Sequence, residues 1–583
     1  MLHTLTRSLR ENKGPALVTV LLSALEVVFE IVIPLFMSNL IDFGIEGGSM
    51  AAVWKFGAFL LLLAAFQLAT GVLAARIAAR ASVGFAANLR EDMYNNVQTF
   101  AFSNIDKFST ASIVTRLTTD TTNVQNAFQM LMRMAIRAPV MLIFSMIVSF
   151  RISRDISMTF LVILPILALA LFFIIRSVFP VFSRVFRTYD ELNNVVQENV
   201  RGIRVVKSFN QERHEIGKFG AISERIYKDF SKGERLITLN APLMQFCIYT
   251  CMIVISWLGA KAIIASGNDP ALGLTTGNLT ALITYTMQIL SSLMMLSMVF
   301  AMLTISLSSA RRIAEVLEER SDIPQPEQPV MTVRDGAVDF DHVSFVYASK
   351  ADKKVLDDID LHIRSGETIG IIGGTGASKS SLVQLIPRLY DVTGGKLTLG
   401  GVDVRDYDLD TLRGAVAMVL QKNELFSGTI AENLRWGNEN ATDEQLRHAC
   451  KLACADEFIS AMPDGYDTHI EQGGTNVSGG QKQRLCIARA LLKKPKVLIL
   501  DDSTSAVDTR TDAQIQQALS TYIPDTTKII IAQRISSVQN ADRIVVLDDG
   551  RIDAVGCHDE LLRTCEIYRE VYESQQKGGE DDA

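Results

Sequence analysis

Six long apolar runs dominate the first 318 residues of the chain. They lie at about 16–41, 54–77, 131–150, 156–178, 243–265 and 279–305. A helix needs about 20 mostly apolar residues to cross the hydrocarbon layer of a membrane, and each run reaches that length. The pattern therefore predicts an α-helical transmembrane domain of six helices over residues 1–318.

Two polar segments, at about 78–130 and 179–242, interrupt this series and keep helical periodicity. We expect the membrane helices to continue into the cytoplasm as paired extensions. Each pair should reverse at a short polar stretch, near Ser109 to Asp120 and near Asn210 to Gly217. Two such elbows would provide contact sites for a soluble domain. The alternative is that these segments are ordinary solvated surface helices.

Basic residues set the predicted orientation. Arg7, Arg10 and Lys13 precede the first run, and Arg311 and Arg312 follow the sixth. Because short cytoplasmic loops are enriched in Lys and Arg, both termini are expected on the cytoplasmic side. With no targeting sequence in view, we expect a multi-pass protein of a bacterial plasma membrane, surrounded by lipid.

The apolar runs contain candidate substrate-contacting residues. Glu26 and Glu30 are four residues apart and so share one face of the first helix, where carboxylates are costly and usually face a cavity or a partner. Met294 and Met298 supply flexible thioethers that suit an adaptable binding surface. The alternatives are packed or snorkelling acids, and methionines that merely face lipid or the core.

A proline-rich stretch, residues 319–330, is the predicted linker, because Pro324, Pro326 and Pro329 prevent a continuous helix. After it, residues 331–574 alternate strand and helix patterns and predict an α/β nucleotide-binding domain with a mostly parallel sheet. Residues 575–583 are predicted to be a disordered acidic tail.

The chemistry of this second domain begins with a glycine-rich loop after the apolar run 368–372. The loop residues are Gly373, Gly374, Thr375, Gly376, Ala377, Ser378, Lys379, Ser380 and Ser381. Small residues let backbone N–H groups surround phosphates, a lysine reaches the outer phosphates, and a hydroxyl reaches Mg²⁺. The pattern is a P-loop, except that Ser378 stands where glycine is usual.

Two further stretches add to the P-loop. The buried run 497–500 ends in Asp501 and Asp502, and an acid at the carboxyl end of a strand can hold Mg²⁺. Residues 477–481 open a helix with a serine and two glycines, which predicts a second anion site.

Composition narrows the possible partners. The chain has 583 residues, a net charge of −7 and 21% charged residues, and its mean hydropathy is +0.21. A negative chain without a long basic patch gives no reason to expect nucleic acid. Its seven cysteines show neither metal-ligand spacing nor a disulfide framework.

Taken together, the P-loop, the stretch 477–481, Asp501 and the following Ser505 to Asp508 resemble the ATP-binding cassette (ABC) family. The resemblance spans nearly the whole chain and is closest to an exporter half-transporter. It implies a type IV ABC exporter-like transmembrane domain fused to an α/β P-loop NTPase domain, with ATP and Mg²⁺ as cofactors.

The resemblance also implies roles for individual residues. Tyr347 would stack on adenine, Lys379 would hold the β and γ phosphates, and Ser380, Gln421 and Asp501 would hold Mg²⁺. The signature residues Ser478, Gly479, Gly480 and Gln481 would contact ATP on a second cassette, and Ser505 and Asp508 belong to the connecting D-loop. One chain alone therefore cannot complete an ATP site.

Three positions depart from the family pattern. Asp502 stands where the catalytic glutamate is expected, Gln533 where a histidine contacts the γ phosphate, and Ser378 in the P-loop. The signature is intact, so this chain's own site is expected to be slow while it completes a competent site on a different half-transporter. The alternative is a homodimer with two weak sites.

The predicted function is ATP-driven export of an amphipathic drug, a lipid or a peptide by alternating access. Two rivals remain open at this point: an importer of metal chelates with an exporter-like fold, and an ATP-gated membrane regulator that transports nothing.

Overall fold

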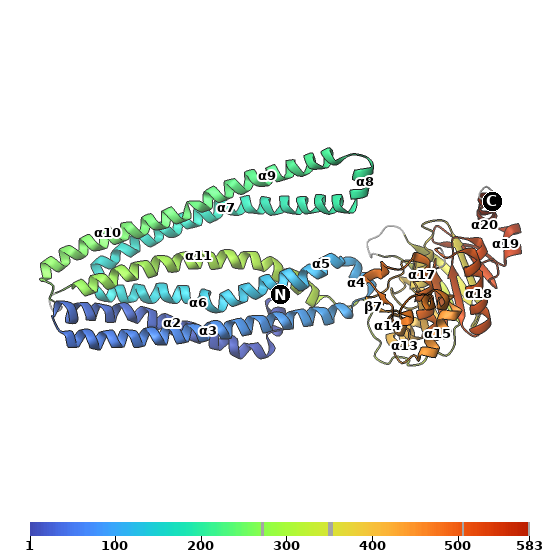
Figure 1. Cartoon of the computed structure of the whole chain (residues 1–583), viewed down its shortest axis with the longest axis horizontal. Coiled ribbons are helices and arrows are strands. Elements are labelled where there is room, and N and C mark those ends of the chain that lie inside the picture. Colours follow the sequence, from blue (N-terminus) through green and yellow to red (C-terminus); the bar gives the residue numbers. More distant parts are fainter. Residues whose placement is uncertain (270–272, 348–353, 504–505, 581–583) are drawn as a thin grey trace. The chain divides into compact units, whose positions relative to one another are not determined.

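A computed structural model covers the whole chain and describes residues 1–269, 273–347, 354–503 and 506–580 (Figure 1). The chain divides into two compact units, which are described separately. Unit 1 comprises Met1–Gln98 and Thr110–Glu319, and unit 2 comprises Thr99–Ser109 and Arg320–Ala583.

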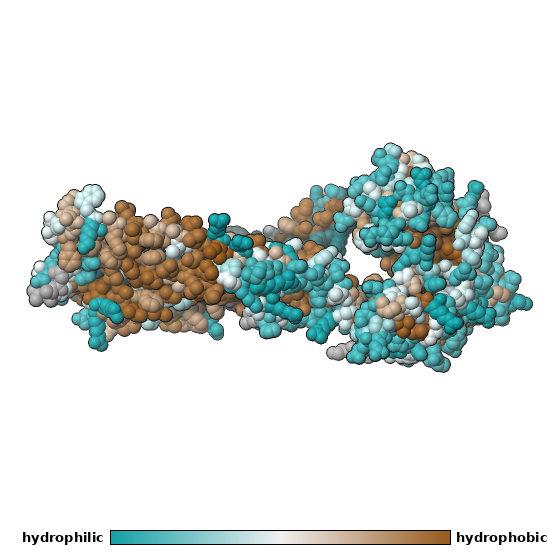
Figure 2. All heavy atoms as spheres, turned by 90° about the horizontal axis from the view of Figure 1, so that it is seen from below, coloured by the Kyte–Doolittle hydropathy of each residue, from teal (hydrophilic) through white to brown (hydrophobic). Residues whose placement is uncertain are grey.

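Unit 1 is entirely helical in its described part. Its helices are α1 (Leu2–Arg7), α2 (Lys13–Asn39), α3 (Met50–Gln98), α5 (Thr110–Thr115), α6 (Thr121–Ile152), α7 (Arg154–Arg201), α8 (Ile203–Ser208), α9 (Glu212–Thr238), α10 (Asn240–Ser266) and α11 (Thr276–Glu318). Among the described residues, six helical stretches are long and apolar enough to cross a membrane, which confirms the six predicted helices. Figure 2 shows the corresponding continuous apolar band over one end of these helices.

Small and polar residues fix the packing inside unit 1. On α3, Ala74, Ala78 and Ala81 are fully buried, and such small side chains let helices approach closely in a membrane. Tyr285 of α11 is also fully buried, and its hydroxyl donates to the carbonyl oxygen of Ile31 in α2 at 2.6 Å. Figure 1 shows α7 and α9 running apart from α6 and α11 toward the short helix α8.

The first elbow lies earlier than predicted. The chain reverses in residues 99–109, around α4 (Phe102–Lys107), whereas Thr110 to Asp120 is helical and leads into α6. Asp120 is 1% exposed, and its carboxylate accepts two hydrogen bonds from Arg312 of α11, at 2.7 and 2.5 Å. This polar stretch therefore ends in a buried aspartate, paired with a partly exposed arginine, rather than in a turn.

The second elbow is close to its predicted place. Between α8 and α9, Asn210 takes a left-handed conformation with φ of 58°, and α9 begins at Glu212. The turn thus occupies the start of the predicted stretch, and the residues up to Gly217 are helical.

The segment 99–109 belongs to unit 2, although the predicted transmembrane domain of residues 1–318 included it. The hydroxyl of Tyr390 donates to Asp106 of α4 at 2.8 Å, and Phe102 lies edge-on to the Tyr390 ring. Asn104 donates to the carbonyl oxygen of Arg320 at 2.9 Å. Helix α4 is thus anchored to the nucleotide-binding domain through both Tyr390 and the start of the linker.

Unit 2 contains two main sheets. A six-stranded sheet has the order β12-β11-β3-β10-β9-β6, and a four-stranded antiparallel sheet has the order β2-β1-β4-β5. The strands are β1 (Val338–Phe345), β2 (Leu356–Ile363), β3 (Thr368–Gly373), β4 (Gly394–Leu399), β5 (Val402–Asp403), β6 (Val416–Val419), β9 (Val497–Asp501), β10 (Thr527–Ile531), β11 (Arg543–Asp548) and β12 (Arg551–Gly556), with the pair β7 (Gly428–Thr429) and β8 (His469–Ile470) apart. The large sheet is parallel except for β12, as predicted.

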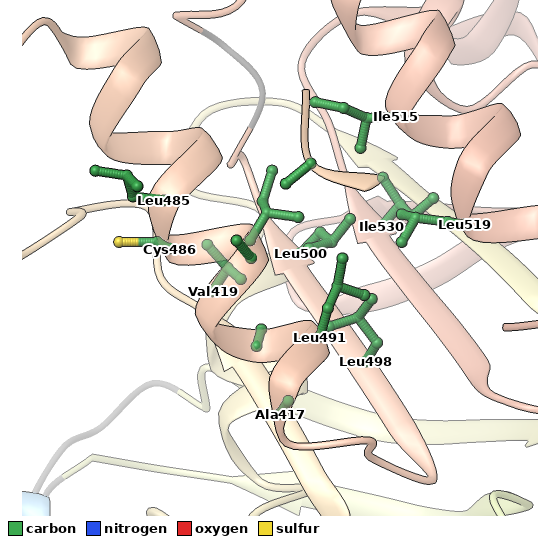
Figure 3. Close-up of a cluster of buried hydrophobic side chains, with 14 of the residues drawn as sticks. Ala417, Val419, Leu485, Cys486, Leu491, Leu498, Leu500, Ile515, Leu519 and Ile530 are labelled. Carbon is green, nitrogen blue, oxygen red and sulfur yellow. The ribbon is translucent and has the colours of Figure 1, made fainter. Parts of the chain in front are cut away.

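Unit 2 contains further helices besides α4. They are α12 (Lys379–Gln384), α13 (Leu409–Ala415), α14 (Ile430–Arg435), α15 (Asp443–Leu452), α16 (Asp456–Ser460), α17 (Gly479–Leu492), α18 (Thr509–Tyr522), α19 (His558–Thr564) and α20 (Glu566–Glu580). Strand β9 is buried on both faces, because Leu498 and Leu500 enter one core cluster while Val497 and Ile499 enter another. Figure 3 shows Leu498 and Leu500 between Leu491 of α17 and Ile530 of β10. A strand between two cores is rigid, and Asp501 stands at its end.

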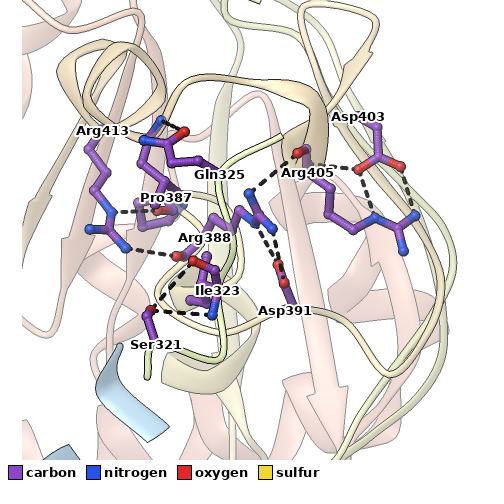
Figure 4. A network of polar contacts seen from close by, with 10 residues as sticks. Ser321, Ile323, Gln325, Pro387, Arg388, Asp391, Asp403, Arg405 and Arg413 are labelled. Atoms are coloured by element: carbon purple, nitrogen blue, oxygen red, sulfur yellow. Dashed lines mark hydrogen bonds and ion pairs between the residues drawn. The ribbon is translucent and has the colours of Figure 1, made fainter. Parts of the chain in front are cut away.

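The linker runs along unit 2 without a helix (Figure 4). Gln325 donates to the Asp408 carboxylate at 3.3 Å, and the Val330 N–H donates to the carbonyl oxygen of Asp406 at 2.9 Å. Beside it, the guanidinium of Arg388, 2% exposed, is held by Asp391 at 2.7 Å.

Helix α20 continues to Glu580 and so extends into the stretch 575–583, for which the sequence predicts a disordered tail. Gln575 explains part of this order: its side chain accepts a hydrogen bond from the Ile535 N–H at 2.9 Å and donates to the carbonyl oxygen of Gln533 at 2.7 Å. Residues 581–583 lie outside the described residues.

The anchoring of α4 is testable by Tyr390→Phe, which removes the hydroxyl and keeps the ring. Losing a hydrogen bond to a carboxylate on a partly exposed surface should weaken the anchor by about 1 kcal/mol, which corresponds to about fivefold faster amide exchange in residues 102–107. Hydrogen exchange with mass spectrometry on the full chain measures this. Tyr347→Phe is the control, because Tyr347 packs against the ring of Tyr390 while its hydroxyl lies beside Ser381. Unchanged exchange in Tyr390→Phe would contradict the assignment.

Candidate nucleotide site

The P-loop connects β3 to α12 and is shaped by close backbone contacts. A side chain at Gly373 would place its Cβ 2.2 Å from the carbonyl oxygen of Leu547, so only glycine fits there. Gly376 has a φ of 89°, which also favours glycine. Gly374, Thr375 and Gly376 are exposed, and their backbone faces solvent at the position where phosphates are expected.

Ser378 is the residue that departs from the glycine pattern, and the structure gives the reason for that pattern. Its φ is 68°, in the left-handed region, and it immediately precedes α12. An L-residue with a Cβ pays roughly 1 to 2 kcal/mol in this conformation relative to the right-handed one. The loop therefore keeps its usual path, with a strained residue at its end.

Lys379 closes the loop on itself. Its ammonium donates to the carbonyl oxygens of Gly373 and Gly374, both at 2.8 Å. Burial lowers the pKa of Lys379, and the nearby carboxylates Asp501 and Asp502 oppose that shift. The ammonium lies inside the loop, where it can exchange these carbonyl contacts for phosphate oxygens.

Ser380 and Asp501 meet as the Mg²⁺ prediction requires. The hydroxyl of Ser380 donates to Asp501 Oδ1 at 3.1 Å, and Asp501 is 3% exposed. Burial raises the pKa of Asp501. A cation beside the carboxylate would oppose this shift and favour the ionised form. A hydroxyl and a carboxylate beside the P-loop suit Mg²⁺ shared with phosphates, which needs few protein ligands.

The two departures Asp502 and Gln533 contact each other directly. Gln533 Nε2 donates to Asp502 Oδ2 at 2.7 Å, and Gln421 Nε2 approaches the same oxygen at 3.4 Å. Asp502 itself has a left-handed φ of 49°, and its N–H donates to the carbonyl oxygen of Ile531 at 3.0 Å. The sequence indicated two separate changes, whereas the structure joins them in one hydrogen-bonded pair.

Tyr347 lies beside the P-loop helix. Its hydroxyl is 2.7 Å from the Ser381 hydroxyl, and its ring contacts Phe345 and Tyr390 edge-on. The side chain is half exposed, so one face of the ring can receive a flat group. This placement agrees with an aromatic next to bound nucleotide.

The signature residues form the exposed start of α17. Ser478 and Gln481 cap this helix reciprocally: the Ser478 hydroxyl accepts from the Gln481 N–H at 3.3 Å, and Gln481 Oε1 accepts from the Ser478 N–H at 2.9 Å. Gly480 must be small, because a Cβ there would lie 2.8 Å from the carbonyl oxygen of Ala506. Ser478 and Gly479 are exposed.

Among the described hydrogen bonds, none joins the signature to the P-loop of the same chain. The D-loop residue Asp508 caps α18, its carboxylate accepting from the Thr511 N–H at 2.9 Å. Ser505 lies outside the described residues. The structure therefore gathers Tyr347, the P-loop, Gln421, Asp501, Asp502 and Gln533 in one place, and the signature in another.

The predicted substrate residues fall into two groups with different surroundings. Glu26 and Glu30 both bond Arg137 of α6, at 2.7 and 2.6 Å, whereas Met294 and Met298 lie exposed on α11. The sequence analysis did not identify Arg137 as the partner of these two acids. The available signal was the position of Arg137 inside an apolar run, because a charge there usually has a partner.

Comparison with known proteins matches both units. The family model of the ABC transporter transmembrane region matches residues 16–294, and the ABC transporter model matches residues 356–505. The uncharacterized ABC transporter ATP-binding protein YfiB of Bacillus subtilis is 36% identical over 96% of this chain and 96% of its own length. A second B. subtilis relative, YknU, is 34% identical over 84% of this chain and 83% of its own length.

A solved structure of a bacterial Atm1-family ABC exporter with ATP bound shares the fold. Its TM-score is 0.82 at 24% identity, over 97% of this chain and 99% of that chain.

The strain at Ser378 predicts opposite effects for two serine-to-glycine substitutions three residues apart, because Ser378 has a left-handed backbone whereas Ser381 is helical. Ser378→Gly should relieve about 1 kcal/mol of left-handed strain, partly offset by the extra freedom that glycine gives the unfolded chain, for a net gain of about 0.5 kcal/mol. Ser381→Gly lies inside α12 and also removes the hydroxyl that meets Tyr347, so it should lose about 1 to 2 kcal/mol. Thermal unfolding of unit 2 in the full chain with ATP measures both. A lower midpoint for Ser378→Gly than for the parent chain would contradict the strain argument.

Proposed function

Because this chain belongs to the ABC transporter family and joins an exporter-type transmembrane region to an ATPase domain, we propose that it is one subunit of a heterodimeric ATP-driven exporter. The chain is an integral membrane protein with an ATP-binding domain. The proposal adds a different partner, a slow ATP site in this chain and the direction of transport.

The need for a partner rests on the incomplete ATP site. The signature is exposed at the start of α17 and makes no hydrogen bond to the P-loop of its own chain in the described part of the structure. A helix N-terminus with free glycines attracts phosphate, so a nucleotide on a second cassette is its natural ligand. ABC exporter half-transporters often dimerise in this way.

The tip of unit 1 supports the same conclusion. Ile203, Val205 and Phe209, in and next to α8, are 43%, 59% and 71% exposed, and a hollow of 330 Å³ lies between α7, α8 and α9. Apolar side chains at a polar helix end favour contact with another protein surface. In the proposed dimer this tip docks on the partner's nucleotide-binding domain, and α4 contacts its own.

The hydrogen bond from Gln533 to Asp502 carries the proposal of a slow site. The aspartate is one methylene shorter than glutamate, by about 1.5 Å, and a displacement of about 1 Å can cost a hundredfold in rate. The amide of Gln533 holds this short carboxylate at 2.7 Å and cannot take up a proton as a histidine would. The site is thus suited to holding ATP rather than turning it over.

The proposed cycle follows from these parts. ATP binding, with Mg²⁺ held by Ser380, Gln421 and Asp501, brings the two cassettes together, and the elbows convey the closure to the membrane helices. Hydrolysis at the partner's site, opposite Ser478, resets the pair. The substrate is an amphipathic small molecule, lipid or peptide, and both termini and the cassette face the cytoplasm of a bacterial cell.

Restoring the usual family residues at positions 502 and 533 tests whether these two changes make the site slow. The full chain, purified alone in lipid nanodiscs, should bind ATP and hydrolyse it slowly, and Asp502→Glu with Gln533→His should raise turnover by roughly one to two orders of magnitude, because it returns the reach and the protonatable group. The matched control is the same pair of changes with Lys379→Ala, which should stay slow. Brisk hydrolysis by the parent chain, abolished by Asp502→Ala, would overturn the proposal.

The assembled pair tests the division of labour. When this chain is co-purified with a half-transporter that carries glutamate and histidine at the corresponding positions, Ser478→Ala should lower ATP turnover by more than tenfold, since it serves the competent site. Asp502→Ala should change turnover less than threefold. Equal losses from both changes would show two equivalent sites.

A further inference from the structure

A cluster of three charged residues lies within the apolar helices of unit 1. Arg137 of α6 stands between two carboxylates of α2: its Nη1 donates to Glu26 Oε1 at 2.7 Å and its Nη2 donates to Glu30 Oε2 at 2.6 Å. The two acids are four residues apart, so one guanidinium bridges one turn of α2. All three residues fall within the predicted membrane-crossing stretches.

The cluster is not electrically balanced. Two carboxylates and one guanidinium carry a formal charge of −1, and in the described part of the chain Arg137 is the cation paired with either acid. An uncompensated charge inside hydrocarbon is costly. One further positive charge would therefore be bound favourably at this place.

Four helices meet around the cluster. Gly71 of α3 leaves room for Glu26, because a Cβ there would lie 3.3 Å from Glu26 Oε1, and Gln288 of α11 donates to the carbonyl oxygen of Glu30 at 3.3 Å. The side chain of Glu26 is 11% exposed, whereas those of Glu30 and Arg137 are 24% and 26% exposed. The cluster thus has a closed side at Glu26 and an open side at Glu30.

A second observation also indicates a missing ligand. Ser23 precedes Glu26 by three residues on the same face of α2 and is 1% exposed, and among the described residues its hydroxyl has no hydrogen-bond partner. A buried hydroxyl without a hydrogen-bond partner is unfavourable, so a polar group bound beside it would be favourable.

We propose that Glu26, Glu30 and Arg137 form a binding site for a lipophilic organic monocation, whose charge completes the neutralisation at Glu30. A divalent metal fits poorly, because the described residues contain no group of three or more His, Cys, Asp or Glu side chains that could hold one. A lipophilic cation also loses little hydration on entering an apolar site, in contrast to a small inorganic ion. The inference rests on the proposed function in one respect: it names the substrate class of the exporter.

The test uses tetraphenylphosphonium, a rigid lipophilic cation, and the nucleotide-free full chain in nanodiscs. The parent chain should bind this cation. Glu30→Gln should weaken binding at least tenfold, because the remaining Glu26 and Arg137 together carry no net charge. Adding Arg137→Gln to Glu30→Gln returns the charge to −1 and should restore binding. A change that merely damaged the structure would not be rescued by a second substitution.

Two controls complete the test. Glu46→Gln removes an exposed carboxylate that follows α2 and should leave binding unchanged. Tetraphenylborate has the same size and shape with a negative charge, and it should not compete with the cation. Binding that is insensitive to Glu30→Gln, as expected if a proton alone satisfies the cluster, would overturn the inference, and so would failure of the double variant to regain binding. Because no nucleotide is present, either result is independent of the ATP turnover that tests the proposed function.

Discussion

The pairing of β9 with β10 is the constraint on which the nucleotide site depends. In this parallel register Ile531 lies opposite Asp501, so the two strands end together and the residues that follow them must meet. Asp501 then faces Ser380, while Asp502 turns through a left-handed backbone conformation toward Gln533. Since β9 is packed between two hydrophobic cores, these carboxylates cannot shift by an ångström without disturbing the sheet. An aspartate at position 502 therefore reaches less far than a glutamate, with little backbone adjustment to compensate.

The chain's own nucleotide site and its signature residues are positioned by different elements. The P-loop lies at the carboxyl end of β3, and Asp501 and Asp502 lie at that of β9, the two strands that flank β10. The signature instead begins α17, where reciprocal capping between Ser478 and Gln481 already fixes the helix start. Capping leaves the N-terminus rigid and exposed, with Gly480 held close to Ala506. A preorganised anion site that serves a nucleotide elsewhere can be complete even when the chain's own site is altered. The two sites of a dimer can thus differ without any change in the fold.

Patterns along the chain were sufficient for the features that depend on local chemistry. The six apolar runs, the glycine-rich turn and the acids after a buried strand could all be predicted, because length, backbone freedom and strand ends are local properties. Features that depend on partners distant in sequence could not. Asp120 lies in a helical stretch and pairs with Arg312 of α11, and Arg137 pairs with the two acids of α2. Helix α20 extends into the predicted tail, where Gln575 bonds the backbone of Gln533. The left-handed conformation of Ser378 was likewise invisible, although the missing glycine marked the position.

The nucleotide site of unit 2 and the charged cluster of unit 1 each contain residues that make the folded state less stable than other residues would at the same positions. A buried ion pair is often no more stable than apolar residues of similar volume, and a serine or an aspartate with positive φ is less stable than glycine in the same place. In unit 2 the strained residues Ser378 and Asp502 border the expected nucleotide, whose phosphates would add compensating contacts. In unit 1 the charged cluster has an excess carboxylate, and a bound cation would compensate it in the same manner. In each unit, ligand binding would therefore relieve an energetic cost, and a ligand that does so also stabilises the conformation that binds it.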